Sequence, residues 1–143
     1  MLDVRVVRQY QKNYPQLLKS INKLFLHKAG AIVVGDAQRF APSGNAHLSG
    51  SIKAKVQLLN DRVIVGTNVE YAPYVEYGTG IYAEGGKGRK TPWSYKSEKY
   101  GWVTTKGMVK QSFLRRSLDW NRQNLVKEWR SLFRKTFRTM GLL

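Results

Sequence analysis

The sequence predicts an α+β fold in which a small, mainly antiparallel sheet packs against a long N-terminal helix and a long C-terminal helix, with a long glycine-rich loop. Three observations support this prediction. Apolar residues recur at helical spacing near both ends, short β-prone segments lie between them, and seven of the 13 glycines fall within 78–107. Because the 143 residues contain no internal repeat or linker, we expect one domain, 1–143.

The first helix is predicted from Pro15 to about Phe40. Proline suits the first turn of a helix, and Pro42 disfavours helix at the residue before it. Residues 1–14 are polar and basic and are expected to form a lead-in arm. The helical spacing predicts one face made of Leu17, Ile21, Leu24, Phe25, Lys28 and Ile32, with Lys19, Lys23 and Leu26 on the far side.

Strands are predicted near 48–56, 63–67, 93–96 and 102–105. We expect them to form one sheet that the two long helices cover on one face. Tyr71–Tyr77 is expected to form a short helical turn at the edge of this sheet. Residues 78–107 are expected to form an extended loop and a hairpin, in which 81–90 is a mobile loop.

The last helix is predicted over about Val109 to Met140. Trp120 falls away from its apolar stripe, and a large aromatic residue on a basic face suggests contact with another chain. The apolar stripe is predicted from Leu114, Leu118, Leu125, Trp129 and Leu132, widened by Phe133 and Phe137, and the basic side from Arg116, Lys127, Arg130, Arg134 and Arg138.

The composition is strongly basic, with 25 Lys and Arg against 9 Asp and Glu and a formal net charge of +16. Such a charge attracts nucleic acid, anionic lipid or an acidic protein surface, but it also serves simply to keep a protein soluble. The absence of cysteine excludes disulfides and thiolate metal sites. Because no apolar run has the length of a signal peptide or membrane span, we expect a soluble protein.

No catalytic, cofactor-binding or metal site is predicted, and we do not expect an enzyme. His27 and His47 are the only histidines, and each is interpreted as an ordinary polar residue. Glu70 and Glu76 are interpreted as charges at the rim of an aromatic cluster rather than as paired catalytic acids. The glycine loop after Gly78 lacks the spacing and the Ser or Thr of a phosphate-binding loop.

Basic and aromatic residues are interleaved from Gly85 to Lys106. Such a segment can bind a nucleic-acid backbone and stack bases. It can equally form a hairpin whose aromatic residues pack against the core or a neighbouring subunit, which is the interpretation we favour.

Three stretches of the chain resemble one family. They are Ala41-Pro-Ser-Gly-Asn-Ala-His-Leu-Ser-Gly-Ser-Ile52, Val65-Gly-Thr-Asn-Val-Glu-Tyr-Ala-Pro-Tyr-Val-Glu-Tyr-Gly-Thr-Gly80, and the segment from Lys106-Gly to Ser112-Phe-Leu-Arg-Arg-Ser-Leu118. The chain resembles, over about residues 10–135, the gene-product-ten-like tail-completion and head–tail joining proteins of long-tailed double-stranded-DNA bacteriophages. It departs from the family pattern at Asn45-Ala46-His47, and at Ser112 and Arg116 where the family has prolines.

The resemblance implies a structural protein of the virion neck or tail. Such proteins form rings, commonly of six copies, that act as tail terminators or head–tail connectors, and DNA passes through the ring during ejection. It therefore implies synthesis in the host bacterial cytoplasm, a homo-oligomer of six or twelve subunits, contact with portal-side and tail-tube proteins, and transient contact with the genome. No cofactor and no membrane partner are implied.

Large aromatic residues in loop-like segments support the same interpretation, because Tyr and Trp are favoured in protein interfaces. The residues expected at a subunit interface are Tyr71, Pro73, Tyr74, Tyr77, Tyr82, Trp93, Trp102 and Trp120. Those expected to contact DNA or an acidic partner are Lys87, Arg89, Lys90, Arg116, Lys127, Arg130, Arg134 and Arg138. The alternative is a basic nucleic-acid-binding module that acts through Gly85–Lys106 and the C-terminal helix.

Overall fold

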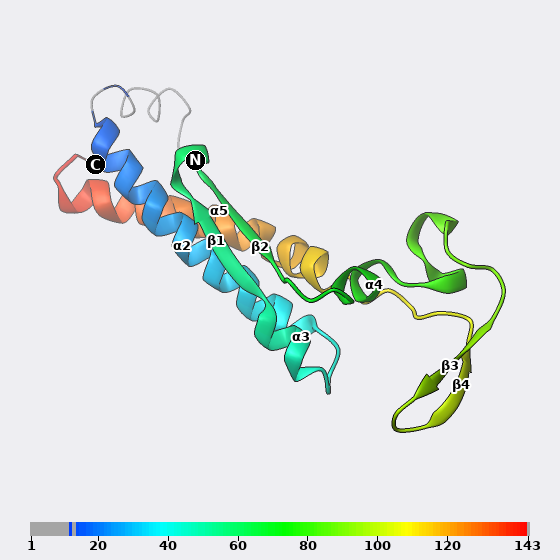
Figure 1. Cartoon of the computed structure of the whole chain (residues 1–143). Coiled ribbons are helices and arrows are strands. Elements are labelled where there is room, and N and C mark those ends of the chain that lie inside the picture. Colours follow the sequence, from blue (N-terminus) through cyan, green and yellow to red (C-terminus); the bar gives the residue numbers. More distant parts are fainter. Residues whose placement is uncertain (1–11, 13, 143) are drawn as a thin grey trace. The chain divides into compact units, whose positions relative to one another are not determined.

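A computed structural model describes residue 12 and residues 14–142 of the chain. The elements follow in the order α2, α3, β1, β2, α4, β3, β4 and α5, with short 3-10 turns η1 to η3 between them (Figure 1). They belong to two compact units. Unit 1 contains residues up to 35, 53–65 and 118–143, and unit 2 contains 36–52 and 66–117. The expected lead-in arm over 1–14 lies almost entirely outside the described residues.

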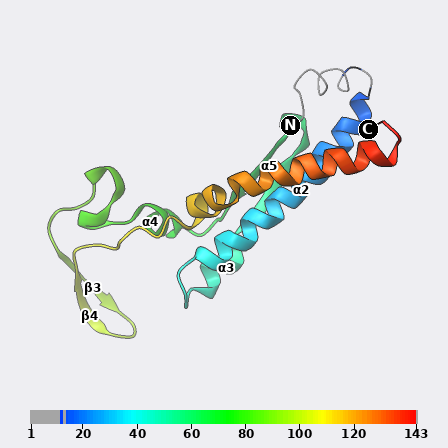
Figure 2. The ribbon, with the colours of Figure 1, turned by 180° about the vertical axis from the view of Figure 1, so that it is seen from behind.

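The core of unit 1 is formed by two helices, α2 (Pro15–Phe40) and α5 (Phe113–Thr139). Within this unit they lie side by side (Figure 2). Leu18 and Ile21 of α2 pack with Phe133 and Phe137 of α5, and all four are buried. The two phenyl rings stack with their centroids 4.3 Å apart. Burying each of these side chains contributes about 1.5–3 kcal/mol to stability.

The bounds of the first helix are as predicted, but its buried face is shifted. Leu26, predicted on the far side, is buried, whereas Leu24 is exposed. The buried positions are Leu18, Ile21, Leu26, Ala29, Gly30, Val33 and Ala37, which include small residues that a search for large apolar side chains overlooks.

The last helix starts at Phe113, four residues later than predicted. A positive φ of 47° at Ser112 breaks the helical pattern there. Its buried face also differs from the prediction, because Leu118 is exposed while Ser117 and Asn121 are buried. The face that packs therefore follows a four-residue spacing through Phe113, Ser117, Asn121, Phe133 and Phe137.

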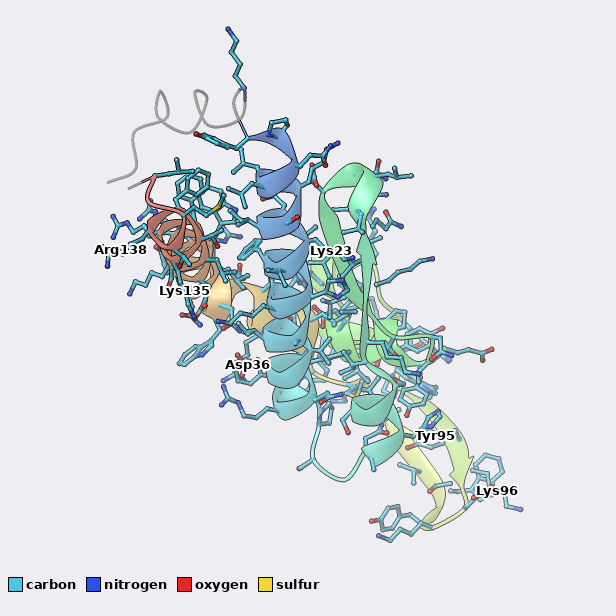
Figure 3. All side chains as sticks on the ribbon, turned by 90° about the vertical axis from the view of Figure 1, so that its left-hand side faces the viewer. Lys23, Asp36, Tyr95, Lys96, Lys135 and Arg138 are labelled. Atoms are coloured by element: carbon cyan, nitrogen blue, oxygen red, sulfur yellow. The ribbon has the colours of Figure 1, made fainter. Side chains whose placement is uncertain are left out.

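A hairpin of β1 (Lys53–Gln57) and β2 (Arg62–Gly66) lies beside α2 in unit 1 (Figure 3). The strands are joined by η1 (Leu58–Asn60), as the predicted turn requires. The contact with α2 is close at Gly30. A Cβ atom there would lie 2.9 Å from the Cβ of Ala54 and 3.0 Å from a methyl carbon of Val63.

Unit 2 contains α3 (Ala46–Ser51), α4 (Ala72–Tyr77), η2 (Gly80–Tyr82) and η3 (Glu84–Gly86). It also contains a hairpin of β3 (Trp93–Ser97) and β4 (Gly101–Thr105). The strand predicted at 48–56 was therefore wrong in its first half, which is helical. Asn45 caps this helix through its side chain, which accepts a hydrogen bond from the backbone N–H of Leu48 at 3.1 Å.

The expected α+β fold, with long first and last helices and antiparallel strands, is confirmed. The expected single sheet is not formed. Among the described residues β1 pairs with β2 and β3 with β4, as two separate two-stranded sheets. The sequence does not show whether two hairpins join into one sheet, because such joining depends on contacts between residues far apart along the chain. The expected mobility of 81–90, which contains the two 3-10 turns, stays a prediction, as does the expectation of a single domain.

Two glycines of α2 allow a matched test of the contact with the β1–β2 hairpin. Gly30→Ala should lower the free energy of unfolding by about 1 kcal/mol, because the cost of overpacking exceeds the gain in helix propensity. Gly35→Ala should raise it by about 0.5–1 kcal/mol, since nothing lies within 4 Å of a Cβ atom there. Urea unfolding measures both, and equal stabilisation by the two changes would contradict the packing described.

Candidate subunit interface

The first two stretches that carry the resemblance contact each other in unit 2. The hydroxyl of Tyr71 donates a hydrogen bond of 2.8 Å to the side-chain oxygen of Asn45, the residue that caps α3. The hydroxyls of Ser51 and Thr67 share a second hydrogen bond of 2.5 Å. The loop before α4 is thus held both to α3 and to the loop before α3 by side chains of the two motifs.

Helix α4 exposes most of its aromatic residues. Ala72, Val75 and Glu76 are buried on one side, whereas Tyr74 and Tyr77 are 60% and 52% exposed. Pro73 is also exposed, and it occupies the first turn, where its missing N–H costs nothing. The predicted short helical turn over Tyr71–Tyr77 is confirmed over Ala72–Tyr77, and it presents tyrosines to solvent.

Glu76 is not a rim charge, as the sequence suggested, but a buried helix cap. It is 4% exposed. Its carboxylate accepts hydrogen bonds from the backbone N–H groups of Leu114 at 2.9 Å and Arg115 at 3.1 Å, in the first turn of α5. Because these N–H groups have no partner within the helix, the carboxylate satisfies them and complements the positive end of the helix dipole. Glu70, in contrast, is exposed.

Arg115 ties the loop after α4 to the start of α5. Its guanidinium donates two hydrogen bonds to Glu84, at 2.8 and 2.6 Å, and lies over the ring of Tyr77 at 5.1 Å. The hydrogen bonds from Arg115, aided by Lys110, lower the pKa of Glu84 from 4.5 to about 2. The same pairing raises the pKa of Arg115. This bidentate pair anchors the segment that contains η3.

The Tyr-Gly-Thr-Gly motif allows two backbone segments to run against each other. The N–H of Thr79 donates to the carbonyl of Met108 at 2.9 Å, and that of Ile81 donates to the carbonyl of Lys106 at 3.0 Å. Gly80 has a φ of 60°, and a Cβ atom there would collide with the Lys106 carbonyl. Glycine is therefore required at this crossing.

The β3–β4 hairpin leaves aromatic residues exposed on both faces. Its register pairs Trp93 with Thr105, Tyr95 with Val103 and Lys96 with Trp102, so Trp93 and Trp102 lie on opposite faces. Trp102 is 75% exposed, and no residue of either strand is fully buried. Such a hairpin has little core of its own, which is the feature expected of a contact surface.

Seven of the eight residues predicted at a subunit interface belong to unit 2, whereas Trp120 belongs to unit 1. All eight are exposed except Trp93, which is half-buried. The sequence-based set omitted Tyr95 and Tyr100 of the same hairpin region, which are 49% and 71% exposed. The sequence could have indicated both, because Tyr95 lies two residues after Trp93 and Tyr100 lies two residues before Trp102.

The predicted basic residues fall into two groups. Lys87, Arg89, Lys90 and Arg116 belong to unit 2, where most are engaged by other groups. The guanidinium of Arg89 lies over Trp93 and that of Arg116 over Phe40, and the Lys90 ammonium donates to the carbonyl of Gly86 at 2.7 Å.

The second group lies on α5 within unit 1. There Lys127, Arg130, Arg134 and Arg138 share one face with Ser131, Lys135 and Thr139, and together they line a surface depression. Lys135 and Arg138 project from α5 away from α2 (Figure 3). The prediction missed Lys135, although its spacing of four residues from Ser131 and three from Arg138 places it on this face.

The described part of the chain contains no group of three or more His, Asp or Glu residues arranged to hold a metal ion. His47 lies beside the ring of Tyr71, with centroids 6.5 Å apart. None of the helices within residue 12 and residues 14–142 has the length and apolar character needed to cross a membrane.

These features define a small, basic α+β protein whose polar contacts stabilise its own fold and whose tyrosine and tryptophan side chains in unit 2 are mostly exposed. The chain belongs to the HK97-gp10-like family, described as a tail component of bacteriophage HK97, because the model of that family matches residues 5–78. The match includes the first of the three stretches and nearly all of the second. The third stretch and α5 lie beyond it, so for them the resemblance rests on the sequence alone.

No curated protein and no solved structure matches the chain. Family membership identifies a structural component of a phage tail, and it confirms the resemblance that the motifs indicated.

Replacing Glu76 tests its role as a buried cap. Glu76→Ala should lower the free energy of unfolding by about 2–3 kcal/mol, because two backbone N–H groups of α5 lose their acceptor. Glu70→Gln, six residues earlier and exposed, should change it by less than about 0.5 kcal/mol. Chemical denaturation measures both variants, and a neutral Glu76→Ala would contradict the cap.

The lowered pKa of Glu84 predicts a particular dependence of stability on pH. The carboxylate is favoured in the folded state, so its contribution is complete above about pH 4.5 and is lost as the pH falls towards 2. The stability difference between the wild type and Glu84→Gln should therefore be constant at neutral pH and shrink to zero through this window. Thermal unfolding from pH 7 to pH 2 measures it, and a difference independent of pH would refute the pairing.

Proposed function

We propose that this chain is a ring-forming tail-completion or head–tail joining subunit in the neck of the virion. Its membership of a family of phage tail components supports this proposal. The described residues add exposed aromatic side chains on α4 and on the β3–β4 hairpin of unit 2. In the proposed ring these side chains contact a neighbouring copy. The interface residues proposed are Tyr71, Pro73, Tyr74, Tyr77, Tyr82, Trp93 and Trp102 of unit 2, together with Trp120 of unit 1.

The β3–β4 hairpin is the observation that carries the proposal. An isolated two-stranded hairpin is only marginally stable in water, and this one has no buried residue. Packing against a second chain would cover its aromatic faces and supply the missing core. Trp and Tyr are enriched among the residues that dominate binding energy in such interfaces.

In the proposed neck the ring meets portal-side proteins on one side and tail-tube proteins on the other. The chain is made in the cytoplasm of the host bacterium, and the viral DNA passes through the ring during ejection. The net charge of +16 suits this passage, since it attracts a polyanion. No catalytic step is proposed for the chain. The tail length of a deletion mutant separates the two roles, because only a terminator controls it.

The second candidate function is a basic nucleic-acid-binding module that acts as a monomer through Gly85–Lys106 and α5. It is favoured by the concentration of charge in the hairpin region, where seven Lys and Arg and one Glu lie between Lys87 and Lys110. The two candidates differ in assembly. The module predicts nucleic-acid binding by a single copy, whereas the neck subunit predicts a closed ring.

Assembly is tested with the purified chain and with its Tyr74→Ser/Trp102→Ser variant. The wild type should form a closed ring. The variant should need a protein concentration about 1,000-fold higher to assemble, because it loses two interface aromatics that contribute about 2 kcal/mol each. Analytical ultracentrifugation and electron microscopy measure this.

Leu59→Ser is the matched control for this test, since Leu59 is fully exposed in unit 1, outside the proposed interface. It should leave the ring intact. A chain that stays monomeric at all concentrations, together with virions that lack a ring of it in the neck, would refute the proposal.

A further inference from the structure

The basic face of α5 is a strongly charged surface of unit 1. We define it as Lys127, Arg130, Ser131, Arg134, Lys135, Arg138 and Thr139, which line one depression. Five of these seven side chains are cations. They come from about three turns of a single helix, so their positions relative to one another are set by helical geometry.

This face is presented by a rigid support. On the other side of α5, Phe133 and Phe137 are fully buried against α2. The indole N–H of Trp129 donates to Asn22 at 3.3 Å, and Lys28 pairs with Glu128 at 2.5 Å. Because the helix is held by these contacts, a ligand of the basic face would not have to order the backbone as it binds.

The five cations have no carboxylate partner among the described residues. The ion pairs in that part of the chain use other basic residues, namely Lys28, Arg39, Lys110, Arg115 and Arg122. Five like charges on one face, with no carboxylate partner within residue 12 and residues 14–142, repel one another, and an anionic ligand relieves this repulsion. The hydroxyl of Thr139 is occupied by the carbonyl of Lys135 at 2.8 Å, so the cations carry the recognition.

The composition of this face favours a phosphate backbone over a protein partner. The core of a protein interface is apolar and depleted of charge, whereas none of the seven lining residues is apolar. Interfaces with DNA are polar, wet and strongly positive. Arginine is suited to phosphate because its planar guanidinium donates two parallel hydrogen bonds.

The spacing of the cations agrees with this ligand. Arg130, Arg134 and Arg138 recur every four residues, and the row from Lys127 to Arg138 extends over about 16 Å of helix. One strand of duplex DNA carries a phosphate about every 3.4 Å along its axis. With both strands counted, about ten phosphates lie within this length. Because the strands wind around the axis, about half of them face the row, so about five phosphates meet five cations.

We infer that the basic face of α5 binds the phosphodiester backbone of double-stranded DNA without regard to sequence. This inference rests on the proposed function, in which the genome passes through the assembled ring. It names the surface of each subunit that contacts the DNA. In the hairpin region, in contrast, Arg89 lies over Trp93 and Lys90 donates to the carbonyl of Gly86, so we assign the DNA contact to the basic face of α5.

The inference is tested by fluorescence anisotropy with the full chain and a labelled duplex of about 30 base pairs, from 50 to 300 mM NaCl. For the wild type, a plot of log affinity against log salt should have a slope of about −4.5, as expected for five phosphates. Arg130→Ala/Arg134→Ala/Arg138→Ala should weaken binding by about 100-fold at 50 mM salt and reduce the slope to about −2.

Two control variants accompany this triple variant. Lys96→Ala/Lys99→Ala/Lys106→Ala removes the same charge from the hairpin region and should weaken binding by less than about threefold, because those residues lie outside the basic face. Arg130→Lys/Arg134→Lys/Arg138→Lys keeps the charges and should keep the slope. An equal loss in the hairpin variant, or a normal slope in the arginine-to-alanine variant, would overturn the inference.

Competition distinguishes DNA from an acidic protein. Polyglutamate at the same concentration of charge should displace the duplex poorly. If it displaces the duplex more effectively than unlabelled DNA does, the partner is an acidic protein surface and the inference is wrong. The oligomeric state is measured on the same samples. A ring that does not bind DNA overturns this inference alone, whereas a monomer that binds DNA through α5 overturns the proposed ring and leaves the inference intact.

Discussion

The buried carboxylate of Glu76 is the contact on which the arrangement of unit 2 depends. It reaches from the end of α4 to backbone N–H groups 38 and 39 residues further along the chain. Because a buried carboxylate is costly without donors, and the first turn of a helix lacks acceptors, each satisfies the other. The position of Arg115 follows from this contact, because Arg115 lies in the same first turn of α5. Its guanidinium there pairs with Glu84 and lies over the ring of Tyr77. The aromatic face of α4 is thus fixed to the start of α5 by polar contacts.

The two long helices could be predicted from sequence because their apolar periodicity extends over many turns. Their buried faces were less predictable, since Ala37, Ser117 and Asn121 are buried although they are small or polar. The short helix α3 was missed because a six-residue segment with loose alternation fits a strand equally well. Its signal was Asn45, a favoured N-cap residue three positions before Leu48.

The residues of the candidate interface also differ in how well the sequence could predict their positions. The tyrosines of the second motif could be singled out from the sequence, because large aromatic residues in a short polar segment cannot all enter one core. The burial of Glu76 could not, since it depends on donors that only the folded chain brings near. The basic face of α5 was predicted in part, and Lys135 completes it by simple helical spacing. The role of unit 2 in assembly stays a proposal, whereas membership of a tail-component family is a finding.

The backbone crossing between Thr79–Ile81 and Lys106–Met108 gives the intervening segment a common point of entry and exit. Residues 87–105, beyond the pair of Glu84 with Arg115, extend from this crossing and return to it. The chain on either side of them is held together by hydrogen bonds in which they take no part. Lengthening such a segment adds little loop-closure entropy to folding. The segment can therefore be exchanged as a unit. Evolution can exchange it to fit a new neighbour, and an engineer can use it to display a foreign peptide, while the motifs that build the crossing stay unchanged.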